Sequence, residues 1–440
     1  MTTPLRIGLA GLGTVGVSVA RLIARQAEAL EASCGRPIEI VAVTARSPNR
    51  DRGIDLSRVR WSADPVTLAA DPAIDVFVEL MGGEGDPAKA AVEAALAAGK
   101  SVVTANKALL ARHGAALAQL AERNGSALNF EAAVAGGIPI VKTLREGLVG
   151  NSVTRVYGIL NGTCNYILTR MEQENLSFAE CLSDAQRLGY AEADPSFDIE
   201  GHDTAQKLAI LASLAFATRV DPEAVYVEGI SSITPEDLQA ADELGYRIKL
   251  LGVAVRTENG IEQRVHPTMV PKKSAIAQVM GVTNAVTIDA DAVREITLVG
   301  PGAGGEATAS AVVSDIGDIA RGSGARPFGR PCAKLGVSEK APMQRHEGGY
   351  YIRMLAVDRP GTAARIATHL AEEMISLESI VQRHPGPRPH GGDRPGDGAA
   401  VPVILITYAT TEDAVRRALA QVEAEKVIEG KPQLIRIEKT

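Results

Sequence analysis

The sequence RIGLAGLGTVG at residues 6–16 decides the fold that we predict for the N-terminal part of the chain. Arg6–Ala10 has the apolar composition of a buried strand, and Thr14–Leu30 carries apolar residues at helical spacing. The GxGxxG turn between them is typical of dinucleotide-binding folds, in which the helix N-terminus faces a pyrophosphate. The alternative is a glycine-rich turn without a ligand. The candidate cofactor-binding residues in this turn are Gly11, Gly13, Thr14, Val15 and Gly16.

Short β-branched runs alternate with Ala-rich helical runs beyond this turn, up to about residue 150. Strands that alternate with helices of this length predict an α/β fold with a Rossmann-type, doubly wound parallel sheet. We therefore assign residues 1–150 to a dinucleotide-binding domain. The further strands expected in it are Ile38–Thr44, Ile74–Leu80, Ser101–Thr104 and Ala127–Glu131, and the further helices are Ala88–Ala98 and Ala108–Arg123.

Residues 151–300 mix strand and helix patterns without regular alternation, which predicts a second, mixed α+β domain. GPGAGG at 300–305 then opens another helix, Ala307–Arg321, and we expect residues 300–325 to return to the first domain and complete it. The strands expected in the second domain are Val153–Leu160, Ile248–Arg256, Gln263–Val270 and Val286–Asp289, and its helices are Cys164–Glu174, Phe178–Leu188 and Thr204–Phe216.

The C-terminal part begins with a stretch rich in Gly, Pro and charge, residues 322–348, which we interpret as a linker. Residues 349–440 then follow the order βαββαβ, which predicts a small ferredoxin-like domain. The sequence HPGPRPHGGDRPGDGAA at 384–400 is dense in Pro and Gly and predicts a mobile loop inside this domain.

The composition excludes several classes of protein. The chain has 440 residues with 46 Lys and Arg against 53 Asp and Glu, and its net charge of −7 argues against nucleic-acid binding. The four cysteines share no CxxC or CxxH spacing, so we expect no disulfide framework or structural zinc site and favour a reducing cytoplasm. The longest apolar run, Leu208–Ala217, is too short for a bilayer, and the N-terminus lacks signal-peptide features, so no membrane partner is expected.

The residues after the second predicted strand bear on the choice of cofactor. An acidic residue at this place binds the ribose hydroxyl of NAD. This chain instead has Arg46 and Ser47, followed by Arg50 ahead of the first acid, Asp51. A guanidinium at Arg46, helped by Ser47 and Arg50, fits a 2′-phosphate, so we predict NADP in preference to NAD. The alternative is that Arg46 is a solvated surface charge.

Two stretches carry candidate catalytic residues. Thr104-Ala-Asn-Lys107 follows a predicted parallel strand at its carboxyl end, where open α/β sheets bind ligands. Lys107 is therefore either a residue beside the nicotinamide or an ordinary lysine at a helix start. The second stretch, AQRLGYAEADPSFDIEGHDTAQK at 185–207, concentrates ionisable side chains, namely Glu192, Asp198, Asp203 and Lys207.

Asp203 and Lys207 are four residues apart and share one face of a predicted helix. Because the helix continues as the apolar run Leu208–Ala217, we expect its start to point into a cleft. An ammonium placed there can donate or accept a proton, while nearby carboxylates orient it. The alternative is a surface ion pair that contributes little.

The 185–207 stretch resembles the signature of the homoserine dehydrogenase family, with every position of the motif filled. Other blocks agree with it, and the resemblance covers about residues 5–320. It implies a reversible, NAD(P)H-dependent reduction of a small-molecule substrate, L-aspartate 4-semialdehyde, to L-homoserine in threonine, methionine and isoleucine biosynthesis. It also implies a homodimer or homotetramer, with residues 151–300 as the substrate-binding and dimerisation domain. The agreeing blocks are GLGTVG at 11–16, TANK at 104–107, NGTCNYI at 161–167 and GPGAGGEATASAV at 300–312.

The resemblance further implies roles for single residues. Lys207 corresponds to the proton donor to the carbonyl oxygen, Lys107 to a second active-site lysine, and Asp203 to a carboxylate that orients substrate or water. Glu192 corresponds to the carboxylate that holds the substrate amino group, and Asp198 belongs to the same polar cluster. Further positions close to substrate or cofactor are Thr163 for the substrate and Met81, Thr104, Lys107, Gly189 and Gly302 for the cofactor.

The loop at 131–138 is similar to a family loop whose main-chain oxygens hold a monovalent cation, usually sodium. Backbone oxygens suit a hard cation, as they do for calcium. Because the glycine motif starts at residue 11, no aspartate-kinase extension is expected before it. The implied cation ligands are Glu131, Val134, Gly136 and Ile138.

Two alternative functions compete with this one. A thiolate at Cys164 could attack an aldehyde, as in semialdehyde dehydrogenases, although no His is placed by a motif to activate it. A dinucleotide sensor without catalysis is the non-enzyme alternative. The presence of Lys207 inside the family signature favours the dehydrogenase over both.

The C-terminal domain resembles an ACT domain, an amino-acid-sensing module. Asp358-Arg-Pro-Gly361 after the first strand corresponds to its usual ligand loop, where Gly361 permits close backbone approach. We expect L-threonine or another pathway amino acid to bind there and inhibit the enzyme. The alternative is a domain that serves only as a dimerisation sheet.

Overall fold

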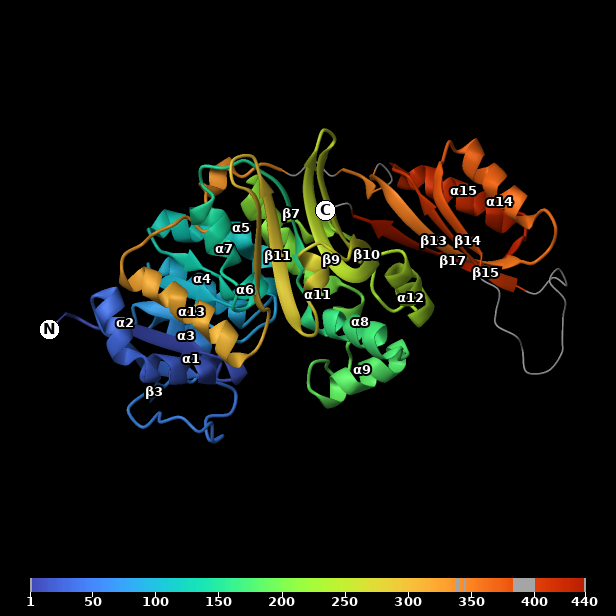
Figure 1. Cartoon of the computed structure of the whole chain (residues 1–440). Helices are drawn as coiled ribbons and strands as arrows, with labels where there is room; N and C mark the ends of the chain where they lie inside the picture. Colours follow the sequence, from blue (N-terminus) through green and yellow to red (C-terminus); the bar gives the residue numbers. More distant parts are fainter. Residues whose placement is uncertain (1, 338–340, 344–345, 383–399, 439–440) are drawn as a thin grey trace.

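The structure is a computed structural model that describes residues 2–337, 341–343, 346–382 and 400–438. Figure 1 shows an N-terminal unit, a central unit and a C-terminal unit arranged side by side along the molecule. Residues 383–399, which hold nearly all of the loop predicted at 384–400, lie outside the described residues. No helix within the described ranges is long and apolar enough to cross a membrane.

A six-stranded, fully parallel sheet forms the N-terminal unit, in the order β3-β2-β1-β4-β5-β6. The predicted α/β fold with a parallel sheet is confirmed here. The strands are β1 (Leu5–Ala10), β2 (Ile38–Thr44), β3 (Arg60–Trp61), β4 (Val76–Glu79), β5 (Ser101–Thr104) and β6 (Leu128–Asn129). The helices are α1 (Thr14–Arg25), α2 (Ala27–Cys34), α3 (Pro65–Ala70), α4 (Ala88–Ala97), α5 (Lys107–Asn124) and α13 (Gly305–Ala320).

Each face of this sheet has its own apolar core, because consecutive strand residues point to opposite faces. Leu9 packs in a cluster with Val19 of α1 and Val312 of α13. Its neighbour Ala10 belongs to the opposite cluster, which includes Leu68 of α3. The helix α13 therefore fills one face of the N-terminal core, although the chain builds the whole central unit before reaching it.

The helix predicted at Thr14–Leu30 is wrong in its extent, because the structure has two helices, α1 and α2, with a break at Gln26. Gln26 has φ −109° and ψ 18°, outside helical geometry. Leu30 stays in phase with Ile23, so the apolar spacing does not reveal the break. Tertiary packing explains the break, because α1 lies on the sheet and buries Val19 and Ile23, whereas α2 buries only its last residue.

A second, mixed sheet runs through the central and C-terminal units, in the order β12-β11-β7-β9-β10-β17-β13-β15-β14. Its central part is antiparallel apart from the short strand β8. The sequence patterns predicted four of the central strands but missed the two-residue β8 and β12, half of whose residues are exposed. The central strands are β7 (Val153–Ile159), β8 (Tyr226–Val227), β9 (Tyr246–Thr257), β10 (Gly260–Pro271), β11 (Thr283–Ala290) and β12 (Arg294–Pro301).

The helix α11 (His202–Phe216) lies at the centre of the molecule and positions the site described below (Figure 1). It packs against α5 of the N-terminal unit and against β7, β9 and β10 of the central sheet. The other helices of this part are α6 (Ala132–Ala135), α7 (Ile140–Lys142), α8 (Gly162–Glu174), α9 (Phe178–Arg187), α10 (Ser196–Ile199) and α12 (Pro235–Glu243). The short irregular helices are Thr143–Gly147, Pro222–Ala224, Ile276–Gln278 and Cys332–Lys334.

Part of the stretch predicted as a linker at 322–348 packs on the body of the protein, at Phe328. Phe328 is 1% exposed, and its ring centroid lies 5.3 Å from that of Phe130. Gly114 of α5 leaves room for this ring, since a Cβ there would lie 3.2 Å from Phe328 Cζ. The connection is therefore anchored before it reaches the C-terminal unit.

The described residues of the C-terminal unit follow the predicted βαββαβ order, with one additional two-residue strand, β16, and the unit continues the central sheet. Its strand β17 pairs in parallel with β10, where Thr268 faces Arg436 and Met269 faces Ile437. Its elements are β13 (Glu347–Val357), α14 (Thr362–Glu372), β14 (Leu377–Gln382), β15 (Ala400–Thr407), β16 (Thr410–Thr411), α15 (Glu412–Ala424) and β17 (Ile428–Ile437).

Candidate active site

The three glycines of the turn after β1 differ in the space around them. Gly11 and Gly16 leave no room for a side chain, whereas Gly13 leaves room for a ligand. Gly11 has φ +100°, and a Cβ there would lie 2.5 Å from Leu80 O. A Cβ on Gly16 would lie 2.0 Å from Gly11 O, so α1 can approach the strand only with a glycine there. Gly13, by contrast, faces open space, with nothing within 4 Å of its Cβ position. The turn is closed on the protein side and open on the other.

The N-terminus of α1 is available to a phosphate. No side chain caps this helix, and both Gly13 and Thr14 are exposed. Uncapped amides at a helix N-terminus bind anions through hydrogen bonds and the helix dipole. The later glycine-rich segment reaches the same place, since a Cβ on Gly305 would lie 2.7 Å from Ser18 Oγ. The residues present therefore fit a dinucleotide pyrophosphate.

The loop after β2 lies beside this turn, because the Gly11 amide donates to Thr44 O at 2.9 Å. Arg46 is exposed, and its guanidinium has no hydrogen bond or ion pair with another described residue. Arg52, which the local sequence pattern did not indicate, holds the loop in place. Its guanidinium donates to Leu12 O at 3.2 Å and to Ser47 O at 2.6 Å.

A buried carboxylate, Glu79, organises the next two strand ends and was also missed. It is fully buried at the end of β4, accepts the Met81 amide at 2.7 Å and the Thr104 hydroxyl at 2.6 Å. Asn106 then caps α5 by accepting the Leu109 amide at 3.1 Å. These bonds set the position of α5 at its first residue, Lys107. The one sequence feature that could have indicated Glu79 is its place as an acidic residue at the end of an apolar strand.

Asp203 joins the two candidate lysines. Its Oδ2 accepts Lys207 Nζ at 2.8 Å, and its Oδ1 lies 3.2 Å from Lys107 Nζ. Lys207 also donates to Leu160 O at 2.8 Å, and its side chain is 12% exposed. Lys107 begins α5 of the parallel sheet, whereas Asp203 and Lys207 stand on α11. The structure thus brings together residues that are about a hundred positions apart in the chain.

Asn161 links this cluster to Asp198. Its amide nitrogen lies 2.9 Å from Asp198 Oδ1 and 2.9 Å from Asp203 Oδ2, while its Oδ1 caps α8. In the sequence, Asn161 stands out only as the first residue of the NGTCNYI block. Its position before a predicted helix is typical of an N-cap. Its two carboxylate partners could not be predicted, because they lie on other elements far along the chain.

The electrostatics of the two carboxylates differ. Burial alone would raise the pKa of Asp203, but the ammonium groups of Lys207 and Lys107 outweigh it and lower that pKa to about 2. Burial and the charge of Asp203 instead raise the pKa of Asp198. Asp203 is therefore the fixed anion between the lysines, and Asp198 is the carboxyl more readily protonated.

The remaining substrate candidates lie on one loop that is tied to α8. Thr163 donates its hydroxyl to Tyr190 O at 2.6 Å, which holds the segment after Gly189. Gly189 has φ +77° and is exposed. Glu192 is exposed as well, and its carboxylate forms no hydrogen bond or ion pair with another described residue. The structure does not bring Glu192 into contact with the Asp203 cluster.

The loop predicted to hold a cation is buried throughout residues 131–136. Glu131 uses its carboxylate to accept the amides of Val141 and Lys142, both at 2.8 Å, which leaves main-chain oxygens as the donors that fit sodium. Gly136 packs on the candidate cofactor residue Gly302, since a Cβ on Gly136 would lie 2.4 Å from Gly302 O. Within the described residues no cluster of His, Cys, Asp and Glu side chains suits a metal.

Cys164 does not offer a nucleophile in this site. It is fully buried, and its thiol lies 3.2 Å from Asp198 O, to which it donates. Burial, together with the charges of Asp198 and Asp203, raises its pKa well above the usual value. A thiol that stays protonated is a poor nucleophile, which argues against the thiolate alternative.

Comparison with known proteins agrees with this arrangement. The family model for the NAD-binding domain of homoserine dehydrogenase matches residues 11–131. The model for homoserine dehydrogenase itself matches residues 139–316. The two matches meet at the cluster described above, because Lys107 lies in the first and Asp203 and Lys207 in the second.

Relatives of the whole chain point to the same family. The chain is 44% identical to homoserine dehydrogenases of Neisseria gonorrhoeae and Pseudomonas aeruginosa, over 99% of this chain and 99% of each relative. A homoserine dehydrogenase structure from Thiobacillus denitrificans has a TM-score of 0.92 at 43% identity and covers 99% of both chains. A hyperthermophilic archaeal homoserine dehydrogenase in complex with NADPH has a TM-score of 0.61 at 28% identity, over 72% of this chain and 97% of that one. The chain therefore belongs to the homoserine dehydrogenase family and is an oxidoreductase with an NAD-binding domain.

Proposed function

We propose that the chain catalyses the reversible reduction of L-aspartate 4-semialdehyde to L-homoserine, with NADPH as the reductant, in threonine, methionine and isoleucine biosynthesis. The observation that carries this proposal is the buried Asp203 between two lysines, one on each side of the junction between the nucleotide-binding unit and the central unit. The reduced nicotinamide supplies the hydride when it is bound. The protein must then supply orientation, charge and a proton.

Lys207 is the residue that we assign to proton transfer. An ammonium has three N–H donors, and Lys207 uses two of them for Leu160 O and Asp203. The third remains for the aldehyde oxygen, where it stabilises the negative charge that grows during reduction and then delivers the proton. Lys107 has one partner in Asp203 and stays the second candidate for this role.

Substrate binding is assigned to the surrounding polar groups. The exposed carboxylate of Glu192 has no protein partner among the described residues and suits the substrate ammonium. Thr163 at the start of α8 and Asp198 on α10 are assigned to the substrate as well. Asp203 is assigned to orient substrate or water. These assignments rest on the family resemblance and on the hydrogen bonds that link Thr163, Asn161 and Asp198 to the lysine cluster.

The cofactor is proposed to be NADP, held by the glycine turn and by Arg46. Met81, Thr104, Gly189 and Gly302 are proposed to line its path toward Lys107. Sodium, or another monovalent cation, is proposed to bind main-chain oxygens of the 131–138 loop, which would brace Gly136 against Gly302.

The C-terminal unit is proposed to be an ACT-like regulatory domain that binds L-threonine at residues 358–361. Support comes from its βαββαβ order and from Gly361, which has φ +94° and open space at its Cβ position. A homodimer or homotetramer and a cytoplasmic location also stay predictions.

Replacing Lys207 tests the proposed function. We expect Lys207→Ala to lower kcat for aspartate semialdehyde by about 10²–10⁴-fold, because proton transfer and charge stabilisation are lost together. The nucleotide dissociation constant should stay unchanged, because Lys207 lies on α11 outside the glycine turn. Oxidation of NADPH is followed by absorbance, and nucleotide binding by fluorescence.

Lys89→Ala is the matched control and should leave kcat unchanged, because Lys89 lies on the outer side of α4 in a partly exposed ion pair with Glu93. Retained turnover in Lys207→Ala would move the proton-transfer role to Lys107. A wild-type chain that binds nucleotide but never turns over aspartate semialdehyde would instead support the sensor alternative.

A further inference from the structure

Glu79, at the end of β4, is a buried carboxylate without a cationic partner. Its side chain is 0% exposed, and no Lys, Arg or His among the described residues forms an ion pair with it. Burying a charge without a partner of opposite sign is strongly unfavourable. An apolar residue would fill the end of β4 without this cost, so the charge at this position calls for an explanation.

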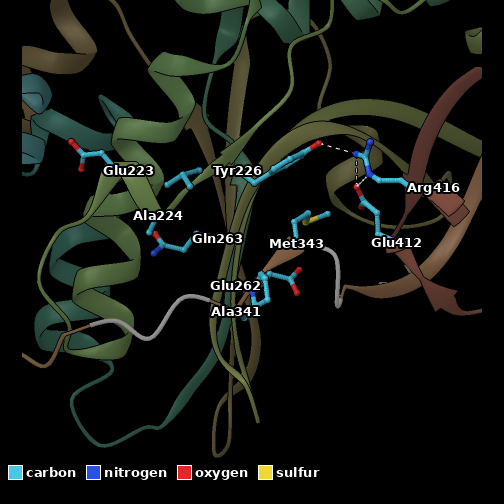
Figure 2. A pocket seen from close by; sticks show the side chains of 11 residues that line it. Glu223, Ala224, Tyr226, Glu262, Gln263, Ala341, Met343, Glu412 and Arg416 are labelled. Carbon is cyan, nitrogen blue, oxygen red and sulfur yellow. Dashed lines mark hydrogen bonds and ion pairs between the residues drawn. The ribbon is translucent and has the colours of Figure 1, made fainter. Parts of the chain in front are cut away.

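The other buried acids show what Glu79 lacks. Figure 2 shows one of them, where Glu412 accepts from Arg416 at 2.6 Å beside a cavity of about 630 Å³. Within the described ranges the second buried acid without an ion pair is Glu131, which lies in the loop proposed to bind a monovalent cation. An unpaired buried acid can thus mark the place of a positively charged ligand. The buried acids that do form an ion pair with Lys or Arg are Asp203, Asp237, Glu262, Asp315 and Glu412.

The hydrogen bonds of Glu79 fit the anionic form. Its Oε1 accepts the amides of Met81 and Gly82 at 2.7 and 3.1 Å, and its Oε2 accepts the Thr104 hydroxyl at 2.6 Å. The Thr104 oxygen in turn accepts the Asn106 amide at 3.0 Å. If Glu79 were protonated, either its own hydrogen or that of Thr104 would lack an acceptor among these groups. A carboxylate, by contrast, uses every donor that surrounds it.

Glu79 lies between the glycine turn and the lysine cluster. In the sheet it pairs with Ala10, which precedes Gly11, and with Thr104, three residues before Lys107. The order of the strands reverses between β1 and β4, which is where sheets of this kind bind a dinucleotide. With the pyrophosphate at α1 and the adenosine ribose beside β2, the ends of β4 and β5 are left for the nicotinamide half.

The charge in this region changes when the cofactor is oxidised. The reduced nicotinamide ring is neutral, whereas the oxidised ring carries one positive charge. The lysine cluster already has a surplus of positive charge, because Lys107 and Lys207 pair with a single carboxylate, Asp203. This surplus would repel a cationic ring unless another anion lay nearby.

We propose that Glu79 is the counter-charge of the oxidised nicotinamide ring. The carboxylate acts through space, and its field is little screened because it is shielded from water. Reduction of the aldehyde moves a hydride, with its electron pair, from the ring to the aldehyde carbon, while the oxygen takes a proton from Lys207. Glu79 stabilises the positive charge that this transfer leaves on the ring. The consequence for the reaction rests on the proposed function, whereas the consequence for cofactor binding does not.

Equilibrium binding of NADP⁺ and NADPH to the full-length chain, measured by calorimetry, tests the inference. The near-isosteric Glu79→Gln removes the charge, so the ratio of the two dissociation constants, NADP⁺ over NADPH, should rise by about tenfold. Binding of 2′-phospho-ADP-ribose, which lacks the nicotinamide ring, should stay within about twofold of wild type. Glu84→Gln is the matched control, because it makes the same change at an exposed residue of the following loop and should leave the ratio unchanged.

A second pair of variants makes the test independent of whether Glu79→Gln folds. Glu79→Asp keeps the charge and Glu79→Asn removes it at equal length, so the ratio should again be higher for the neutral member. An unchanged ratio in the neutral variants would overturn the inference. So would an equal loss of affinity for NADP⁺, NADPH and 2′-phospho-ADP-ribose, which would give Glu79 a purely structural role. A chain that shows the change in ratio but never reduces aspartate semialdehyde contradicts the proposed function alone.

Discussion

Asp203 is the residue at which the two halves of the site meet. An isolated carboxylate with 7% of its side chain exposed would be unstable as an anion, yet two ammonium groups and the Asn161 amide keep it ionised. Their attraction lowers its pKa to about 2 against the opposing effect of burial. Through this single side chain, the positions of Lys107 and Lys207 become linked.

Arg46 carries a prediction about cofactor preference. Arg46→Ala should weaken NADPH binding by about 10–100-fold, which is the loss of one or two hydrogen bonds to a charged phosphate. NADH binding should barely change, because NADH lacks the 2′-phosphate. Fluorescence titration with both nucleotides measures the two constants. Arg25→Ala, at the far end of α1, is the control, and equal losses for both nucleotides would contradict the NADP assignment.

At the scale of elements, the turn between β1 and α1 contains glycines with different roles: Gly16 is required for packing, whereas Gly13 faces the ligand side. Gly16→Ala would place a Cβ 2.0 Å from Gly11 O, so we expect it to lower the free energy of unfolding by about 1–3 kcal/mol. Gly13→Ala meets nothing within 4 Å and has an ordinary φ of −80°, so its stability should stay within about 0.5 kcal/mol of wild type.

Nucleotide affinity distinguishes these two variants further. Gly13→Ala should fold normally but bind NADPH more weakly, because its methyl group would occupy the approach of the pyrophosphate. Urea unfolding and nucleotide titration of the same samples provide both measurements. A Gly13→Ala variant with wild-type affinity would show that the pyrophosphate does not approach this turn.

The strand β9 carries a buried lysine that predicts a pH-dependent stability. Lys249 is 1% exposed and donates to Asn165 Oδ1 at 2.9 Å and Val279 O at 2.6 Å. Burial lowers its pKa from 10.5 to about 8. Between these values the unfolded lysine is protonated and the folded one is not, so unfolding takes up a proton and stability rises with pH.

The measurement is the difference in free energy of unfolding between wild type and Lys249→Met. From about pH 8 to about pH 10 this difference should rise in favour of wild type, by up to about 1.4 kcal/mol per pH unit. Lys273→Met, the same substitution at an exposed lysine, should show no such slope. A difference that stays flat across this range would mean that Lys249 keeps its proton in the folded state.

At the scale of the whole molecule, the C-terminal unit is joined to the catalytic body by a continuous sheet and by buried ion pairs, of which the one at Asp237 is the most buried on its acidic side. Asp237 of α12 is fully buried and accepts bonds from two residues of β13: Tyr351 at 3.0 Å, and Arg353 at 2.6 and 3.0 Å. The β10–β17 pairing adds a parallel contact beside it. The C-terminal unit is therefore held to the central part of the protein by backbone pairing and by hydrogen bonds to a buried carboxylate.

Asp237→Ala should lower the free energy of unfolding by about 3–5 kcal/mol, because it leaves Arg353 without its buried partner. It should also split unfolding into two transitions, in which the C-terminal unit unfolds at a lower urea concentration than the N-terminal unit. Trp61, the single tryptophan of the chain, reports on the N-terminal unit by fluorescence, while circular dichroism reports on all units. Glu236→Ala is the control, and coincident transitions in Asp237→Ala would refute the coupling.

Local patterns predicted the strands of both sheets well where consecutive residues are apolar and buried, as in β1, β5 and β9. They failed where packing decides the outcome. The break between α1 and α2 falls in a stretch that stays in helical phase, and β12 is an edge strand with no fully buried residue. Arg52, Glu79 and Asn161 were missed for a related reason, because each has a partner far away in sequence: Leu12 O, the Thr104 hydroxyl and the Asp198 carboxylate.

The sequence by itself determined the parallel nucleotide-binding fold, the glycine turn and the family, because these depend on local spacing and on residue identity. Only the tertiary structure decided that Lys107 and Lys207 share one carboxylate, that Cys164 is buried and protonated, and that the C-terminal unit extends the central sheet. The physical reason is that burial and electrostatic attraction depend on distances in space. Residues remote along the chain acquire those distances only when the helices and strands pack.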